Sequence, residues 1–289
     1  MQIQAWLRHA RTCIEASQAA SATPQLDAEV ILAHVLSCSR TYLHTWPDKV
    51  LDENQLKRAE GLLQQRATGL PVAHLLGERE FWSLPLEVNA STLIPRPDSE
   101  CLVEQALQLP LPAQARVLDL GTGTGAIALA LKSERPQWQV VAVDKAVDAV
   151  KLAQANAERL RLVVEVQQSD WFRNIAEQRF DLIVSNPPYI DARDPHLQQG
   201  DVRFEPHSAL VAGASGFADL AIIITTARSY LNANGWLVLE HGWEQAAQCR
   251  IALHEAGYGQ VQSQRDYANL ERITFGQWES DKGSETDVE

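Results

Sequence analysis

One glycine-rich turn between two apolar runs constrains the fold of this chain more than any other feature. Residues 116–120 are typical of a buried strand, the turn 121–125 follows, and residues 126–131 open a helix. A second apolar run at residues 140–144 completes a β-α-β unit, which requires a parallel sheet with helices packed on it. We therefore predict an α/β fold of the doubly wound, Rossmann-like kind.

The same turn predicts the kind of ligand that the fold binds. Glycines let the backbone approach a ligand closely, and the free N–H groups at a helix start favour a carboxylate. Asp144 ends the next strand, 19 residues after Gly125, close to the spacing of an acid that binds a ribose diol. A solvated strand end is the alternative for Asp144, but its register with the glycines favours the ligand role.

The glycine spacing bears on the class of cofactor. The turn has the spacing G-x-G-x-G, whereas NAD and FAD proteins typically have G-x-G-x-x-G, and Asp119 precedes it by two residues. This pattern favours S-adenosylmethionine over a dinucleotide, although a glycine turn alone fits either class. The candidate cofactor-binding residues are Gly121, Thr122, Gly123, Thr124, Gly125 and Asp144.

A third predicted strand, at residues 163–167, ends near an acid and a large aromatic side chain. In a fold of this kind the adenine ring of the cofactor lies beyond that strand end. Asp170 could accept a hydrogen bond from the adenine amino group, and Trp171 could cover the face of the ring. An ordinary place in the hydrophobic core is the alternative for Trp171.

The fourth predicted strand, at residues 180–184, runs into Ser185-Asn186-Pro187-Pro188-Tyr189. Ligands of open α/β sheets bind just beyond the carboxyl ends of the strands. The Asn186 side-chain oxygen and the Pro187 carbonyl can accept both hydrogens of a planar –NH2 group, and Tyr189 can stack on its plane. We predict that Asn186, Pro187, Pro188 and Tyr189 bind the substrate, and that Asn186, Pro187 and Tyr189 are catalytic in methyl transfer to this nitrogen.

The chain divides into four predicted regions. Residues 1–74 show helical periodicity without strand patterning and predict a bundle of about four helices. In residues 75–94 apolar and polar side chains alternate as in a strand, which predicts a β-hairpin linker. Residues 95–278 are predicted to form the α/β domain. Residues 279–289 are polar and acidic, and we expect them to be disordered.

Two irregular segments are long enough to serve the site. Residues 93–100 contain two prolines, and Asp98 or Ser99 can cap the helix that follows. This segment is either a stiff connector or a strap that folds over the cofactor. Residues 190–215 predict a functional or mobile loop. The histidines of that loop lack convincing ligand neighbours, so we expect no metal site.

The composition narrows the partners of the chain. The net charge is −12, and residues 1–75 are neutral, which argues against a DNA partner. No apolar run approaches the roughly 18–20 residues that span a bilayer, and the first residues lack the order of a signal peptide. The four cysteines are widely scattered in the sequence, without a C-x-x-C pair, and this favours free thiols over a disulfide framework or a zinc site. We expect a cytoplasmic protein, with a monomer as the default.

Five motifs occur together along nearly the whole chain. They are Pro71-Val-Ala-His-Leu-Leu-Gly77 with Phe81, Leu93-Ile-Pro-Arg-Pro-Asp-Ser-Glu100, Asp119-Leu-Gly-Thr-Gly-Thr-Gly125, Asn186-Pro-Pro-Tyr189 and Asp201-Val-Arg-Phe-Glu-Pro206. In these motifs the chain resembles the HemK/PrmC family of protein-glutamine N5-methyltransferases, which modify class I peptide-chain release factors. His74 stands where many members have Tyr, and Asp98 and Ser99 stand where many have Glu and Thr.

The resemblance implies a fold, a donor and a substrate. It implies a seven-stranded class I methyltransferase domain, an N-terminal helical domain that helps to dock the release factor, and a β-hairpin linker. It also implies that S-adenosylmethionine contacts the glycine turn, Asp144, Trp171 and Asn186. The expected substrate is the glutamine of the Gly-Gly-Gln loop of the release factor, held by Asn186 through Tyr189.

Two alternatives remain at this stage. An adenine-N6 DNA methyltransferase shares the Asn-Pro-Pro-Tyr motif and would present the same –NH2 geometry after base flipping. It should carry basic clusters for its target, whereas residues 1–75 are neutral. A methyltransferase-like fold kept only as a binding module is the second alternative, and the intact glycine, acid and Asn-Pro-Pro-Tyr elements argue against it.

Overall fold

The computed structural model describes residues 1–17 and 21–279, which form two compact units. The helical unit comprises Met1–Glu78, Val88–Ala90 and Asp194–Glu205. The sheet unit comprises Arg79–Glu87, Ser91–Arg193 and the chain from Pro206 onward. The acidic tail predicted to be disordered lies, except for its first residue, outside the described residues.

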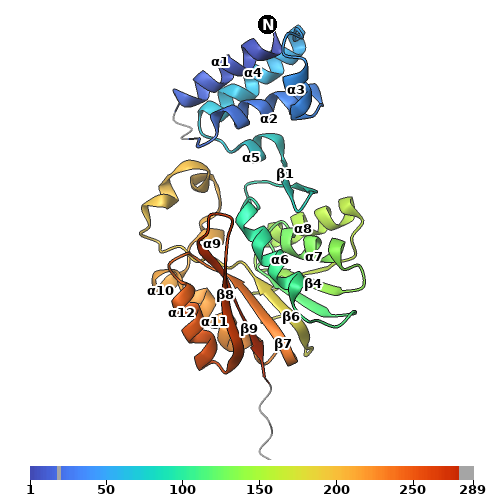
Figure 1. The fold of residues 1–289 in the computed structure, drawn as a ribbon, viewed down its shortest axis with the longest axis vertical. Coiled ribbons are helices and arrows are strands. Elements are labelled where there is room, and N and C mark those ends of the chain that lie inside the picture. Colours follow the sequence, from blue (N-terminus) through green and yellow to red (C-terminus); the bar gives the residue numbers. More distant parts are fainter. Residues whose placement is uncertain (18–20, 280–289) are drawn as a thin grey trace, which may run out of the picture. The chain divides into compact units, whose positions relative to one another are not determined.

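In its described part the helical unit contains five α-helices: α1 (Ile3–Glu15), α2 (Pro24–Leu36), α3 (Arg40–Thr45), α4 (Glu53–Ala67) and α5 (Val72–Leu76) (Figure 1). Trp6 and Ile31 are fully buried between them. A capping box begins α4, because Asp52 accepts a hydrogen bond from the Gln55 backbone N–H while the Gln55 side chain accepts one from the Asp52 backbone. Helical periodicity in the sequence therefore led to the right element type here.

The sheet unit is built on seven strands in the order β5-β4-β3-β6-β7-β9-β8 (Figure 1). They are β3 (Arg116–Leu120), β4 (Gln139–Asp144), β5 (Glu165–Gln168), β6 (Phe180–Ser185), β7 (Leu231–Glu240), β8 (Tyr258–Arg265) and β9 (Glu271–Trp278). β3 to β7 pair in parallel, and β9 is antiparallel to both β7 and β8. The predicted seven-stranded α/β fold is confirmed.

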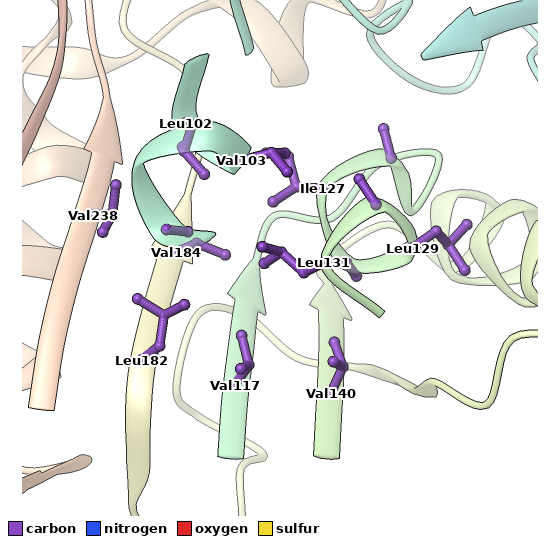
Figure 2. Close-up of a cluster of buried hydrophobic side chains, with 14 of the residues drawn as sticks. Leu102, Val103, Val117, Ile127, Leu129, Leu131, Val140, Leu182, Val184 and Val238 are labelled. Atoms are coloured by element: carbon purple, nitrogen blue, oxygen red, sulfur yellow. The ribbon is translucent and has the colours of Figure 1, made fainter. Parts of the chain in front are cut away.

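Helices cover both faces of this sheet, because its parallel strands are apolar on both sides. One face packs on α6 (Glu100–Gln108), α7 (Ala126–Glu134) and α8 (Val147–Leu160), and Figure 2 shows Val117 and Leu182 below side chains of α6 and α7. The other face packs on α11 (Ala218–Ala227) and α12 (Ala246–Glu255). Val117 and Leu118, which are adjacent in β3, belong to opposite cores, as the twofold periodicity of a strand requires.

Three element boundaries differ from those that the sequence predicts. The sequence predicts a helix over residues 217–231 and a strand over residues 236–240. Helix α11 nevertheless ends at Ala227, because Leu231 already pairs with Phe180 as the first residue of β7. That strand is therefore longer than residues 236–240. The third strand of the prediction begins at Glu165 rather than Val163, which is 81% exposed.

The linker contains the predicted β-hairpin, whereas the long loop contains more regular structure than predicted. The hairpin consists of β1 (Glu78–Phe81) and β2 (Leu84–Glu87), joined by a turn with positive φ angles. Short helices occupy residues 190–215: η2 (Pro195–Gln198), η3 (Gly200–Phe204), α9 (His207–Leu210) and α10 (Gly213–Gly216). A further 3-10 turn, η1 (Pro97–Ser99), precedes α6, and Ser99 makes no side-chain capping bond there, contrary to its predicted role.

Arg66 joins residues 194–205 to the rest of the helical unit. Its side chain is only 3% exposed and forms ion pairs with Asp27 at 2.8 Å and with Asp201 at 3.4 Å. It also donates hydrogen bonds to the carbonyls of Gly69 and Leu70. These contacts place part of the predicted 95–278 domain in the compact unit of the N-terminal helices.

We predict that Arg66→Ala lowers the stability of the helical unit by about 3 kcal/mol, because it leaves the mostly buried Asp27 carboxylate without its cation. The measurement is the urea midpoint followed by far-ultraviolet circular dichroism. Arg58→Ala, at an exposed position of the same helix, is the matched control and should change the midpoint little. Equal midpoints for the two variants would contradict the role of Arg66.

Candidate active site

A cavity of about 530 Å³ opens at the carboxyl ends of β3, β4 and β6, entirely within the sheet unit. This volume lies in the range of small-molecule sites. The residues predicted from the sequence that line it are Gly121, Thr122, Gly123, Thr124, Asp144, Trp171, Asn186 and Pro188. The structure thus brings the glycine turn, the acid of the second strand and the Asn-Pro-Pro-Tyr motif to one chamber.

The glycine turn has a backbone conformation that other residues seldom adopt. Gly121, Gly123 and Gly125 have φ angles of +71°, +55° and +85°. A Cβ atom on Gly125 would lie 3.1 Å from Leu129 Cδ1 and 3.3 Å from Ala153 Cβ, so space is also short at that position. Gly125 does not line the cavity; it lets α7 begin closely packed.

Asp144 ties the end of β4 to the glycine turn. Its Oδ2 accepts a hydrogen bond from the Gly123 N–H at 2.9 Å, and its Oδ1 accepts one from the Ala146 N–H at 2.9 Å. Each carboxylate oxygen keeps a further lone pair, so both can still accept hydrogen bonds from ligand hydroxyls. The predicted register between Asp144 and the glycines corresponds to a direct contact.

Asp119 supports the turn from below. It is fully buried, and its Oδ2 accepts hydrogen bonds from the Thr122 hydroxyl at 2.6 Å and from the Ala128 N–H at 3.2 Å. Its Oδ1 has no hydrogen-bond partner among the described residues. Burial raises the pKa of Asp119 to about 7, and the nearby Asp144 charge acts in the same direction.

We predict that Asp119 makes stability fall with rising pH. Because its pKa is higher in the folded chain than the ordinary value of 3.8, the folded state holds a proton between pH 4 and 7 that the unfolded state has lost. The unfolding free energy of the wild type relative to Asp119→Asn should therefore fall across this window, by up to about 1.4 kcal/mol per pH unit. Urea titrations at pH 5, 6, 7 and 8 measure it, and a constant difference would contradict it.

Trp171 lies against the glycine turn. A Cβ atom on Gly121 would be 3.4 Å from the Trp171 ring. The indole N–H donates a hydrogen bond to the Asp219 carboxyl. Burial raises the pKa of Asp219, and this hydrogen bond lowers it by a smaller amount. Trp171 itself has a φ of +51°. It both lines the cavity and packs on the hydrophobic core. Asp219 also lines the cavity, and no pattern in the sequence pointed to it.

Asn186 stands where β6 ends. Its Nδ2 donates a hydrogen bond to the Ser99 Oγ at 3.2 Å. Pro188 lines the cavity with Asn186, whereas the buried Pro187 and the partly buried Tyr189 are not among the lining residues. The predicted substrate contacts of Pro187 and Tyr189 therefore stay predictions.

The Tyr189 hydroxyl contacts a buried acid that the sequence analysis did not single out. It donates to Glu240 Oε1 at 3.3 Å. Burial raises the pKa of Glu240 to about 7, while hydrogen bonds from Ser99 and Tyr189 and the charge of Arg272 lower it. Burial also raises the pKa of the Tyr189 hydroxyl, followed by the Glu240 charge, so Tyr189 is a neutral donor here.

The proline-containing segment before α6 contributes directly to the chamber. Leu93, Pro95 and Ser99 line it, together with Phe81 of β1 and Thr92. Residues 93–100 are therefore not merely a connector, because three of them line the cavity. Three residues of the long loop, Ser208, Ala209 and Val211, complete the wall.

Within residues 1–17 and 21–279, no group of three His, Cys, Asp or Glu side chains is arranged to hold a metal ion. The His196 ring instead pairs with Asp194 at 2.8 Å. In the same described ranges, no helix is both long and apolar enough to cross a membrane.

Two family models match the chain. Residues 5–77 match the PrmC N-terminal domain, and residues 97–202 match the methyltransferase small domain. Relatives that match over nearly the whole chain belong to the same family as these two domain models indicate. A release factor glutamine methyltransferase of Shewanella oneidensis is 59% identical over 261 residues, which cover 90% of this chain and 91% of that protein. The release factor glutamine methyltransferase of Escherichia coli is 53% identical over 279 residues, covering 96% and 99%.

Solved structures show the fold of the sheet unit at much lower identity. A methyltransferase from Pyrococcus furiosus superposes with a TM-score of 0.54 at 19% identity, covering 68% of this chain and 89% of its own. The catalytic domain of hMettl16 gives a TM-score of 0.55 at 17% identity, covering 68% and 76%. The class I methyltransferase fold is thus found by sequence pattern, by strand order and by superposition.

Proposed function

Because the chain belongs to the release factor glutamine methyltransferase family, we propose that it methylates the side-chain amide nitrogen of a glutamine. The target is the glutamine of the Gly-Gly-Gln loop of class I peptide-chain release factors, and the modification modulates translation termination in the cytoplasm. One observation carries the proposal: Asn186 lines the same cavity as the glycine turn and Asp144. This shared lining supports a donor site and an amide-binding group in one chamber.

The residues present fit S-adenosylmethionine as the methyl donor. Asp144 offers carboxylate oxygens to the ribose hydroxyls, the glycine turn offers close backbone approach, and Trp171 offers an aromatic face to the adenine. Asp170 lies in the same wall and is paired with Lys145 at 3.4 Å. When bound, S-adenosylmethionine supplies a methyl group activated by its sulfonium.

Asn186 and Pro187 account for the choice of an amide nitrogen. The lone pair of an amide is delocalised into its carbonyl, so the nitrogen is a poor nucleophile. Accepting both of its hydrogens at the Asn186 side-chain oxygen and the Pro187 carbonyl holds the amide in place and stabilises the positive charge that grows on nitrogen. No base is needed before methyl transfer, because the proton can leave afterwards. We propose that Pro188 and Tyr189 also bind the substrate, with the Tyr189 ring stacked on the plane of the amide.

The helical unit is the proposed docking region for the release factor. The match of residues 5–77 to the PrmC N-terminal domain supports this assignment. Incubation with labelled methyl donor and either a release factor or duplex DNA tests the substrate, followed by mass spectrometry of the Gly-Gly-Gln peptide. Label on the release-factor glutamine supports the proposal, and label on DNA alone would establish the adenine-N6 alternative.

We predict that Asn186→Ala lowers the turnover of release-factor methylation by roughly 10²–10³-fold, the usual effect of removing one preorganised polar contact. The measurement uses saturating S-adenosylmethionine. Asn234→Ala, at an exposed position of β7 that does not line the cavity, is the control for the same chemical change and should keep wild-type turnover. Near wild-type turnover in Asn186→Ala would remove the assigned role.

We predict that Asp144→Asn weakens S-adenosylmethionine binding about 10- to 100-fold, because hydrogen bonds to a charged acceptor are replaced by weaker neutral ones. Isothermal titration calorimetry measures the affinity without any release factor. Asp148→Asn, at an exposed position nearby in α8, is the matched control. If both variants bind the donor as the wild type does, Asp144 is not its ribose ligand.

A further inference from the structure

Four polar side chains converge where β6 and β7 end. Ser99 and Glu240 are 4% and 1% exposed. The Ser99 hydroxyl lies between two partners: it accepts a hydrogen bond from Asn186 Nδ2 at 3.2 Å and hydrogen-bonds to the Glu240 carboxyl. The Tyr189 hydroxyl donates to the same carboxyl at 3.3 Å. Both hydroxyls thus join the Asn-Pro-Pro-Tyr motif to one buried acid.

The hydrogen-bonding capacity of the Ser99 hydroxyl determines whether it donates to Asn186 or accepts from it. A hydroxyl has one hydrogen to donate and lone pairs to accept with, and an ionised carboxylate can only accept. The Ser99 hydrogen therefore goes to Glu240, and only lone pairs remain for Asn186. Because lone pairs attract the –NH2 end of an amide and repel its oxygen, Asn186 must turn Nδ2 toward Ser99.

We propose that Ser99 and Glu240 are positioning residues that hold the Asn186 side-chain amide with Oδ1 free as an acceptor. This inference rests on the proposed function, since an acceptor is needed only where the substrate presents an –NH2 group. A flipped Asn186 would present its own –NH2 group to that of the substrate, donor against donor. We call the hydrogen-bonded series Glu240–Ser99–Asn186 the relay. It prevents this unproductive orientation of Asn186 before the substrate binds.

The local backbone supports this role for Ser99. Residues Pro97–Ser99 form the 3-10 turn η1, and the Ser99 N–H donates to the Arg96 carbonyl at 3.1 Å. Although Ser99 stands immediately before α6, its side chain makes no capping bond to that helix. Its hydroxyl is thus directed to Asn186 and Glu240 instead of to the helix start, where serine usually acts.

The electrostatic surroundings of Glu240 fit an anionic acceptor. Arg272 stabilises its charge, and Asp98 opposes it. Arg272 is itself held by Asp266, through a contact of 3.1 Å between Arg272 Nε and Asp266 Oδ2. The assays are run at pH 8 because this lies above the Glu240 pKa of about 7, so the ionised carboxylate is favoured there.

The kinetic test uses Ser99→Ala, Ser99→Thr, Glu240→Gln and the Ser99→Ala/Glu240→Gln double variant at pH 8, with a release factor as substrate. We expect kcat to fall about tenfold in Ser99→Ala, the usual effect of one lost hydrogen bond, while the KM for S-adenosylmethionine stays unchanged. Ser99→Thr keeps the hydroxyl and should stay within about threefold of wild type. Ser133→Ala, a partly buried serine of α7, is the control and should keep wild-type kcat.

The double variant separates a relay from two independent structural roles. Glu240→Gln places an amide beside Ser99, and its –NH2 group can reverse the direction of the Ser99 hydroxyl. If Glu240 acts on Asn186 through Ser99, Glu240→Gln should lower kcat by about tenfold alone but by less than twofold in the Ser99→Ala background. Multiplicative losses, or an unchanged kcat in Ser99→Ala, would overturn the relay.

A second measurement needs no substrate and therefore stands apart from the proposed function. Nuclear magnetic resonance of the full chain follows hydrogen exchange of the Asn186 side-chain –NH2 group. We expect it to be protected in the wild type and in Ser99→Thr, and at least tenfold less protected in Ser99→Ala. Equal exchange in wild type and Ser99→Ala would overturn the inference, whereas absence of release-factor methylation by the wild type would overturn only the proposed function.

Discussion

The parallel pairing of β3 with β4 on one side and with β6 on the other is the constraint from which the site follows. In register, Leu120 lies beside Val143 and beside Ser185. The next residues along the three strands are Gly121, Asp144 and Asn186. Three residues separated widely in the sequence therefore share one edge of the sheet. Short hydrogen bonds then complete the site, from Gly123 to Asp144 and from Asn186 to Ser99.

Much of this arrangement follows from local patterns in the sequence. Apolar runs identify the central strands, the glycines identify a turn with positive φ angles, and the position of Asp144 follows from the length of one β-α-β unit. Asn186 was predictable because it ends a buried strand, and such ends meet at one edge of a parallel sheet. These predictions succeed where the physical cause lies within a few residues.

The features that the sequence did not reveal depend on tertiary pairing. Glu240 is identified by its hydrogen bond from the Tyr189 hydroxyl, and Asp219 by its hydrogen bond from the Trp171 indole. Neither contact follows from a local sequence pattern. The end of α11 was misplaced because strand pairing at Leu231 overrides helical periodicity. Ser99 has the sequence position of a helix cap, but its hydroxyl serves a partner 87 residues away.

The site places two carboxyl groups in surroundings where ionisation is costly. Asp119 and Glu240 are buried to about the same extent, and burial raises the pKa of each to about 7. Asp119 fixes the glycine turn, and Glu240 contacts Tyr189 of the Asn-Pro-Pro-Tyr motif. The fold accepts this cost because the same groups orient neighbouring hydroxyls, and strain or polarity of this kind is commonly retained at functional sites.

The salt bridge between Arg66 and Asp201 has a consequence for how the chain can be divided. Residues 194–205 leave the sheet unit shortly after the Asn-Pro-Pro-Tyr motif and belong to the helical unit. The polypeptide thus passes between the units several times, at Glu78, Val88, Ala90, Arg193 and Glu205. Cutting away the N-terminal helices would not release a self-sufficient enzyme domain, because Asp201 and its neighbours would lose the surface on which they are folded. The loop that follows the Asn-Pro-Pro-Tyr motif is therefore folded as part of the helical unit, although the motif itself belongs to the sheet unit.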